Sequence, residues 1–240
     1  MLDFAIRNRK EIFRDSLSII LGIALPVILL FLFTAIEKNA PLDTFKVQHL
    51  APGLIVFGFA FLTMFSALLI AKDKQTALLT RLFASPLKTA DYVIGYALPM
   101  LPLAILQIVI CYIAAAAAGL SAEWINLLAG IAVLLPIAMM SVFLGLCLGA
   151  VFTDKQISGI GTIYITLVQF LGGAWMDVSL LGETFKHIAY ALPFIHSIEL
   201  AQEVISGDYS AFQQHIWPIA GYAVLALALA SLSLMKIRKR

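Results

Sequence analysis

Six long apolar segments alternate with short polar stretches along this chain, and this alternation limits the fold more than any other feature. The segments cover residues 17–36, 51–71, 92–118, 127–152, 157–175 and 216–234. Each has about the 20 residues that a helix needs to cross the hydrocarbon core of a bilayer. The pattern therefore predicts an all-α integral membrane protein with six transmembrane helices, and an even number of spans places both termini on one side.

The uneven distribution of basic residues predicts the orientation. Thirteen of the sixteen lysines and arginines lie before the first span, in the second and fourth connections, and after the last span. The other connections hold only Lys38, Lys46 and Lys186. Because cytoplasmic loops are enriched in Lys and Arg, we expect both termini in the cytoplasm of a prokaryotic cell, and a multi-pass protein in its cytoplasmic (inner) membrane.

The composition excludes an ordinary soluble domain. Hydrophobic residues make up 62% of the chain and charged residues only 12%, whereas about a quarter of a typical soluble domain is charged. Residues 1–240 are interpreted as one transmembrane domain.

The N-terminal residues 1–16 combine basic and apolar side chains at helical spacing. This pattern is typical of an amphipathic helix that lies along the cytoplasmic interface. Its basic residues either meet lipid headgroups or a protein partner, or they only set the topology. They are Arg7, Arg9, Lys10 and Arg14.

The cytoplasmic connection 72–91 is predicted to contain a short amphipathic helix over residues 77–83. The apolar side chains of such a helix need a protein groove in which to be buried, and a Ser-Pro pair ends it. The segment is therefore a candidate docking surface for a cytoplasmic partner. Its residues are Ala77, Leu78, Arg81, Leu82, Phe83, Ser85 and Pro86.

Residues 176–215 are too many for a turn and too apolar for a disordered loop. We expect one or two short helices, broken at Pro193, that form an outer re-entrant hairpin and cap a pathway. Pro99 and Pro102 should kink the third span. Gly145 and Gly149 form a G-x-x-x-G pair, which we interpret as a helix-packing face.

Polar residues within the spans are candidates for a translocation path. The fifth span carries a stripe that either bonds to neighbouring helices or lines the path. In the second span, an aromatic row faces lipid or an apolar substrate, with two hydroxyl groups on adjacent faces. The path candidates are Thr63, Ser66, Phe61, Phe65, Ser158, Thr162, Thr166 and Gln169.

Several kinds of chemistry are missing from the sequence. There is no G-x-x-x-x-G-K-[ST] motif, so the chain is not expected to hydrolyse ATP or to be an enzyme. The predicted spans contain no ionisable residue, which disfavours ion-driven transport. His196, Glu199 and Glu203 share a helical face; we favour the wet side of an interfacial helix over a metal site, and no catalytic, metal or cofactor site is predicted.

The chain resembles the membrane subunits of the type-2 ABC exporters. The resemblance rests on the entry 7–15, the cytoplasmic segment 76–88 with its Ser-Pro-Leu sequence, and the outer segments 171–175, 191–194 and 207–208. The chain has Lys74-Gln75-Thr76 where that family often has Glu-Gly-Thr, and Gln202 where an Arg is frequent.

The resemblance implies a transporter of two permeases, identical or paralogous, and two cytoplasmic ATPase subunits that hold ATP and Mg. Segment 77–83 would then be the coupling helix. We expect export of an amphipathic or apolar compound, such as a drug, a peptide antibiotic or a lipid-like molecule. The alternatives are an ATP-independent intramembrane enzyme or channel, and an immunity or sensing component without transport.

Overall fold

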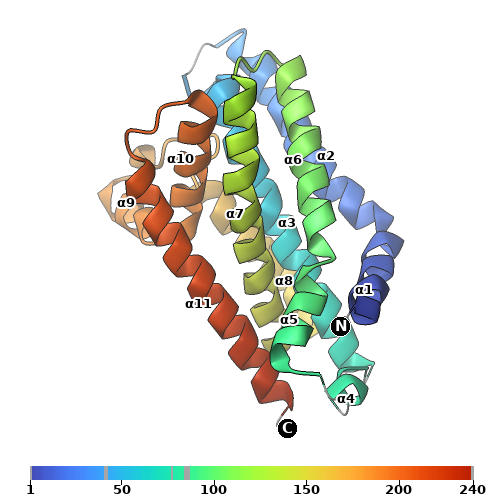
Figure 1. The fold of residues 1–240 in the computed structure, drawn as a ribbon. Helices are drawn as coiled ribbons and strands as arrows, with labels where there is room; N and C mark the ends of the chain where they lie inside the picture. Colours follow the sequence, from blue (N-terminus) through green and yellow to red (C-terminus); the bar gives the residue numbers. More distant parts are fainter. Residues whose placement is uncertain (1, 41–42, 77, 84–86, 239–240) are drawn as a thin grey trace.

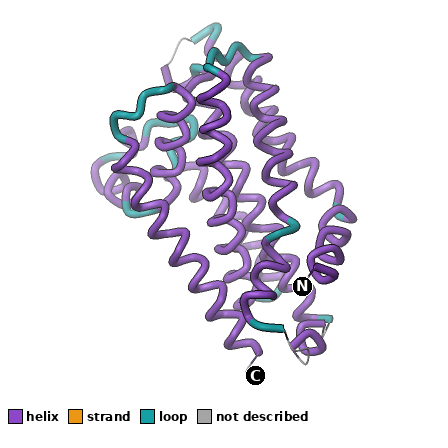
Figure 2. Tube along the Cα trace, in the orientation of Figure 1, coloured by secondary structure: helices purple, strands orange, loops and turns teal. Residues whose placement is uncertain are grey.

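The computed structural model describes residues 2–40, 43–76, 78–83 and 87–238, and every regular element in these ranges is a helix (Figures 1 and 2). This confirms the all-α prediction. The N-terminal helices are α1 (Leu2–Arg14), α2 (Ser16–Glu37), η1 (Asp43–Phe45), α3 (Val47–Gln75), α4 (Leu78–Phe83), α5 (Thr89–Ala97) and α6 (Met100–Ala117). The C-terminal helices are α7 (Trp124–Val151), α8 (Asp154–Leu171), η2 (Val178–Leu181), α9 (Glu183–Tyr190), α10 (Pro193–Ser206) and α11 (Phe212–Arg238).

Helix α3 forms the centre of the bundle and packs against α2, α6, α7, α8 and α10. The glycines of α7 explain its close approach to α3. A Cβ atom at Gly145 would overlap the side chain of Ser66 and the carbonyl of Thr63, and one at Gly149 would overlap the backbone of Ala67. The structure thus confirms that this glycine pair is a packing face.

Prolines divide two of the predicted helical segments. The third apolar segment consists of α5 and α6, separated at Leu98 and Pro99. Pro193 is the first residue of α10, and Ala191 and Leu192 separate this helix from α9. Proline lacks an N–H and is therefore tolerated in the first turn of a helix. The predicted break at Pro193 is confirmed; of the two prolines predicted to kink the third span, Pro99 lies at the interruption and Pro102 lies inside α6.

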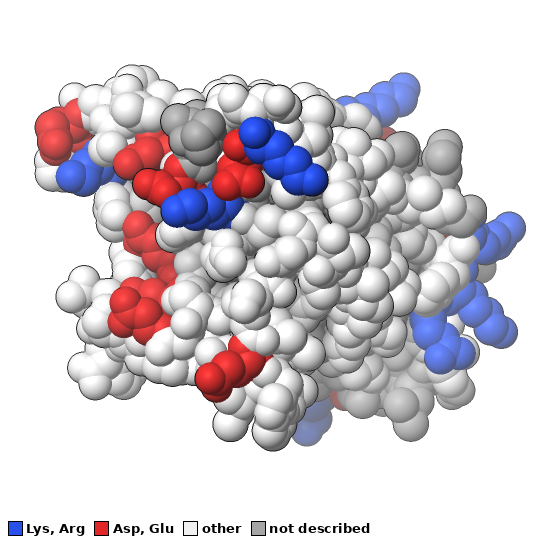
Figure 3. Space-filling view, turned by 90° about the horizontal axis from the view of Figure 1, so that it is seen from above, with Lys and Arg blue, Asp and Glu red and all other residues white. Residues whose placement is uncertain are grey.

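The predicted cytoplasmic parts lie at one end of the bundle. Figure 1 shows the N-terminal helix α1, the short helix α4 and the C-terminus near the lower end, while the α2–α3 connection and α10 lie toward the other end. Figure 3, viewed from above, shows acidic side chains over this second end. The segments that lie at this second end of the bundle carry eight acidic and three basic residues: Glu37, Asp43, Glu123, Asp177, Glu183, Glu199, Glu203, Asp208, Lys38, Lys46 and Lys186.

Among the residues that the structure describes, four helical segments are long and apolar enough to cross a membrane. They are Val47–Gln75, Thr89–Ala117, Trp124–Val151 and Phe212–Arg238. Helix α8 begins with Asp154 and Lys155 and carries the polar stripe, which lowers its hydropathy. The chain is a multi-pass membrane protein, and the count of six spans stays a prediction.

Candidate functional site

Helix α1 is attached to α3 by an ion pair that the sequence did not predict. The Arg7 guanidinium donates hydrogen bonds to both carboxylate oxygens of Asp73, at 2.6 and 2.7 Å. The Tyr96 hydroxyl donates to the same carboxylate at 2.8 Å. The Asp73 side chain is buried, with 3% of its surface exposed. The hydrogen bond to Asp73, followed by the Coulombic attraction, raises the pKa of Arg7.

The next residue of α1, Asn8, is also bonded to the bundle. Asn8 is buried, and its side-chain amide donates to the Gly95 carbonyl of α5 at 3.0 Å. Of the four basic residues predicted to face lipid or a partner, Arg7 therefore contacts the protein interior, whereas Arg9, Lys10 and Arg14 are exposed. Asp73 lies outside the predicted second span, which ends at residue 71; the central helix extends past that residue and buries Asp73 in its last turn.

The short helix predicted over residues 77–83 is present as α4, which covers Leu78–Phe83. Leu79 is buried, and Leu82 and Phe83 pack against the core of the bundle. The Tyr92 hydroxyl donates to the Leu82 carbonyl at 2.5 Å, and the Phe83 and Tyr92 rings lie edge to face. Ala77, Ser85, Pro86 and the Arg81 side chain lie outside the described residues.

Leu78 differs from the other apolar residues of α4. It is only partly buried and belongs to none of the described core clusters. Leu82 and Phe83, which we expected to enter a partner's groove, instead contact their own chain. Among the described side chains of α4, Leu78 is therefore the one best placed to contact another molecule.

The residues that depart from the family pattern before α4 have structural roles. The Lys74 ammonium donates to the carbonyls of Gly149, Ala150 and Phe152 at 3.2, 3.1 and 2.8 Å. These carbonyls lie at the end of α7, where a helix lacks internal partners and where the helix dipole favours a cation. The Gln75 amide donates to the Asp154 carboxylate at the start of α8.

The polar stripe of α8 faces away from the bundle. Ser158, Thr162 and Thr166 are exposed, and Gln169 is partly exposed. Each hydroxyl donates to the carbonyl four residues earlier in its own helix. Of the two alternatives for this stripe, bonding to other helices of this chain is therefore not supported.

The two path candidates with hydroxyl groups in α3 lie elsewhere. Thr63 and Ser66 are buried, and they donate to the Ser141 and Val142 carbonyls of α7 at 2.9 and 3.1 Å. They hold α3 and α7 together and do not reach an exposed surface, because the glycines of α7 bring the two helices so close. Their burial gives no support to the prediction that they line the path.

The aromatic side chains in the row on α3 are more buried than side chains that face lipid would be. Phe57 is 2% exposed, and Phe61 and Phe65 are partly buried. Both partly buried side chains lie against α2, where a Cβ atom at Gly22 would touch the ring of Phe65 and the Cβ atom of Phe61. Phe61 and Phe65 remain path candidates through the part of their surface that stays exposed.

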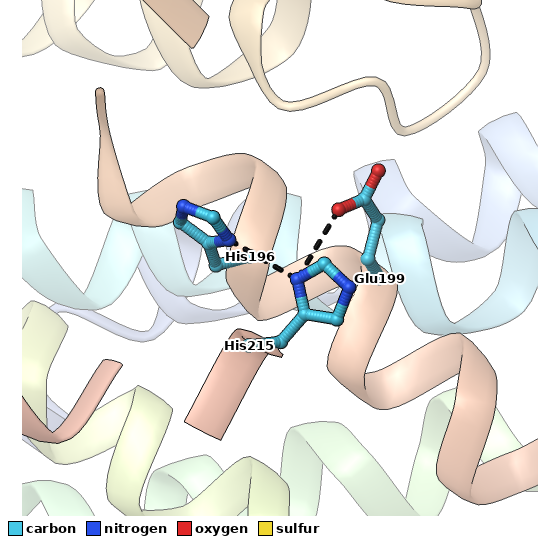
Figure 4. Close-up of side chains that lie close together, drawn as sticks. All are labelled: His196, Glu199 and His215. Atoms are coloured by element: carbon cyan, nitrogen blue, oxygen red, sulfur yellow. Dashed lines mark hydrogen bonds and ion pairs between the residues drawn. The ribbon is translucent and has the colours of Figure 1, made fainter. Parts of the chain in front are cut away.

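At the acidic end, α10 and α11 bring together three potential metal ligands. His196 and Glu199 project from α10 and His215 from α11, and Figure 4 shows them pointing toward one another. The prediction of a shared face for His196, Glu199 and Glu203 omitted His215, which lies in the first turn of α11 and just outside the predicted sixth span. Burial raises the pKa of the Glu199 and Glu203 carboxyls.

Two cavities open beside this cluster. One of about 380 Å³ is lined by residues that include Asp177, Lys186 and Tyr190. A second of about 330 Å³ is lined by residues that include Glu203 and His215. Glu199 lines both cavities, so the cluster is reachable from outside the bundle.

The comparison with protein families decides the broad class. The model of the ABC-2 type transporter membrane domain matches residues 4–205, from α1 through most of α10. This chain belongs to the ABC-2 type transporter family. None of the curated proteins with which the sequence was compared matches it.

Family membership defines the role of the chain in coarse terms. An ABC-2 membrane domain is the transport subunit of an ABC transporter and works with an ATPase subunit. No ATPase domain is detected in this chain, in agreement with the missing phosphate-binding motif. The resemblance inferred from the sequence is confirmed.

Proposed function

We propose that this chain is the permease of an ATP-driven exporter that moves an amphipathic or apolar compound across a prokaryotic cytoplasmic membrane. Two copies, identical or paralogous, would form the path, with six spans each and both termini in the cytoplasm. A drug, a peptide antibiotic or a lipid-like molecule is the expected cargo. ATP and Mg would be held by the partner ATPase.

The observation that carries this proposal is the uncovered polar face of α8. Polar residues inside a membrane normally face a bundle interior or an aqueous cavity. Because no helix of this chain covers Ser158, Thr162 and Thr166 in the described structure, a second permease or a shared path would supply the missing surroundings. The stripe has hydroxyl groups and no charge, which suits an amphipathic cargo better than an ion.

We assign contact with the ATPase to α1 and α4, at the end of the bundle that is predicted to be cytoplasmic. Exposed Arg9, Lys10 and Arg14 lie on α1, and Leu78 gives α4 an apolar contact point. Since α1 is attached to α3 through Arg7 and Asp73, a movement at this end would reach the central helix directly.

Reconstitution with the ATPase tests the proposal. Vesicles that contain both subunits should take up or release cargo only with hydrolysable ATP. Leu78→Asp should lower co-purification of the ATPase at least about tenfold, because a charge replaces an apolar contact. Leu180→Asp is the matched control: it makes the same change at a residue that is 77% exposed, at the other end.

Two outcomes would contradict the proposal. Flux or catalysis by the single subunit without any ATPase would support an intramembrane channel or enzyme. Stable binding of the ATPase without ATP-driven flux would support an immunity or sensing component.

A further inference from the structure

The side chains of His196, Glu199 and His215 form a cluster that the transport function does not use. The Nδ1 atoms of the two histidines lie 3.1 Å apart. Glu199 Oε2 lies 3.3 Å from His215 Nδ1. All three candidate ligand atoms are within 4.8 Å of one another. Two ligands at 109° around a zinc ion are separated by about 3.3 Å, so the two shorter distances already match the edges of a tetrahedron.

The hydrogen bonds around His196 direct a lone pair into this cluster. His196 Nε2 lies 3.0 Å from the Tyr190 carbonyl oxygen. A carbonyl only accepts hydrogen bonds, so Nε2 carries the proton and Nδ1 presents its lone pair toward His215. Metal-binding histidines commonly donate their other N–H to a carbonyl or carboxylate in this way.

The other two side chains also have outer partners. The Tyr190 hydroxyl donates to Glu199 Oε1 at 2.7 Å and leaves Oε2 directed at His215. Glu203 Oε1 lies 3.7 Å from His215 Nε2, on the side of the ring away from the cluster. A carboxylate on that side favours the tautomer with the proton on Nε2, which is the tautomer that a metal ion at Nδ1 requires.

An unsatisfied acceptor is a second indication of a ligand. Glu199 Oε2 is buried, and no described residue forms a hydrogen bond to it. Buried carboxylate oxygens are costly without a partner. His215 itself has only 10% of its side chain exposed, so the cluster is held in a partly dry environment at the acidic end of the molecule.

We propose that His196, Glu199 and His215 bind a divalent transition-metal ion, with Zn²⁺ as the best match. Two imidazoles, one carboxylate and an open fourth position are a common zinc environment, and nitrogen ligands disfavour Mg²⁺ and Ca²⁺. Glu199 lines both neighbouring cavities, so water has access to this cluster. The ion would cross-link α10 to α11, and this site is independent of the proposed export function.

Zinc titration of the purified, tag-free subunit in detergent tests the proposal. After EDTA treatment, the protein should bind about one Zn²⁺ per chain saturably in the presence of excess Mg²⁺. His196→Ala and His215→Ala should each weaken binding at least tenfold. Tyr190→Phe removes only the hydroxyl that orients Glu199, and it should weaken binding about tenfold. His187→Ala is the control, since that histidine is 84% exposed on α9 and should leave affinity unchanged.

A spectroscopic readout keeps the test informative if one variant folds poorly. Co²⁺ in place of Zn²⁺ should give the visible absorption of a four-coordinate ion in the wild type and in His187→Ala, and lose it in His196→Ala. The proposal is overturned if the wild type binds no Zn²⁺ saturably, or if the affinity is unchanged in both His196→Ala and His215→Ala. Neither outcome depends on transport activity.

Discussion

Arg7 of α1 and Asp73 of α3 are 66 positions apart in the sequence, yet the two terminal nitrogens of the Arg7 guanidinium donate hydrogen bonds to the two carboxylate oxygens of Asp73. Arg7→Ala would leave the buried Asp73 carboxylate without its cation. Removing one partner of a buried pair costs about 3–5 kcal/mol. Because 39% of the Arg7 side chain is exposed, we expect a loss of about 2 kcal/mol, measured as a lower unfolding temperature in detergent.

Two further variants separate this effect from a general loss of charge. Arg9→Ala removes an exposed basic residue of the same helix and should change stability by less than about 0.5 kcal/mol. Adding Asp73→Asn to Arg7→Ala should recover part of the loss, because the unpaired charge is removed. Equal destabilisation by Arg7→Ala and Arg9→Ala would contradict this account.

Gly145→Ala should destabilise the bundle by about 3 kcal/mol, because the new methyl group meets the Thr63 carbonyl and the Ser66 side chain and overpacking is costly. Thermal unfolding of the detergent-solubilised chain measures the effect. Gly221→Ala is the matched control: it makes the same change in a membrane helix, but its Cβ atom would have no neighbour within 4 Å. A similar loss in both variants would show that helix packing is not the cause.

Lys74→Met should cost about 1–3 kcal/mol, since the end of α7 loses a charged donor to three carbonyls while the apolar stem is kept. Amide exchange at the start of α8 should also become faster, because this cap lies at the α7–α8 junction. Lys72→Met changes an exposed lysine of the same turn and should be close to neutral. If Lys74→Met is equally neutral, the cap does not contribute to stability.

Thr162→Val and Thr63→Val should have opposite effects on stability and transport. The exposed Thr162 bonds only to its own helix, so its replacement should leave unfolding nearly unchanged and alter flux. The buried Thr63 bonds to α7, and its replacement should cost about 1 kcal/mol. Normal flux with Thr162→Val and Thr166→Val combined would argue against a path along α8.

The turn at Asp177 should depend on pH. Its carboxylate accepts hydrogen bonds from Ser179, which lower the pKa of Asp177 below its ordinary value of 3.8. A lowered folded-state pKa means that the stabilisation is present above 3.8 and is lost as the pH falls through the lower value. Amide exchange in η2 should therefore accelerate in strong acid. Asp177→Asn should remove this pH dependence, whereas a persistent acid effect in that variant would assign it to another group.

Features written in local sequence could be predicted, and features that join distant elements could not. Proline positions defined the breaks before α6 and α10, and the glycine pair of α7 defined a packing face. The Arg7–Asp73 pair depends on how α1 folds back onto α3, which no spacing encodes. His215 is sixteen residues beyond Glu199 and on another helix, so its place beside His196 follows only from the packing of α10 against α11.

The hydroxyl groups show the same limit. Thr63 and Ser66 have the composition of a path surface, as do Thr162 and Thr166. Their difference comes from the neighbouring helix: α7 offers glycines and backbone carbonyl acceptors to α3, whereas no helix in the described part of the chain covers the stripe of α8. Polarity predicts that a residue needs surroundings other than lipid, but only tertiary structure says which surroundings it has.

The interruption at Leu98 and Pro99 divides one hydrophobic segment into two helices, α5 and α6. Below it, α5 is fastened to α1 through Asn8 and Gly95 and also touches α11. Above it, α6 has its own hydrogen-bond ladder. A displacement of α1 would therefore act on α3 through Arg7 and, at the same time, on α5 through Asn8, and α5 would pass it on to the C-terminal helix.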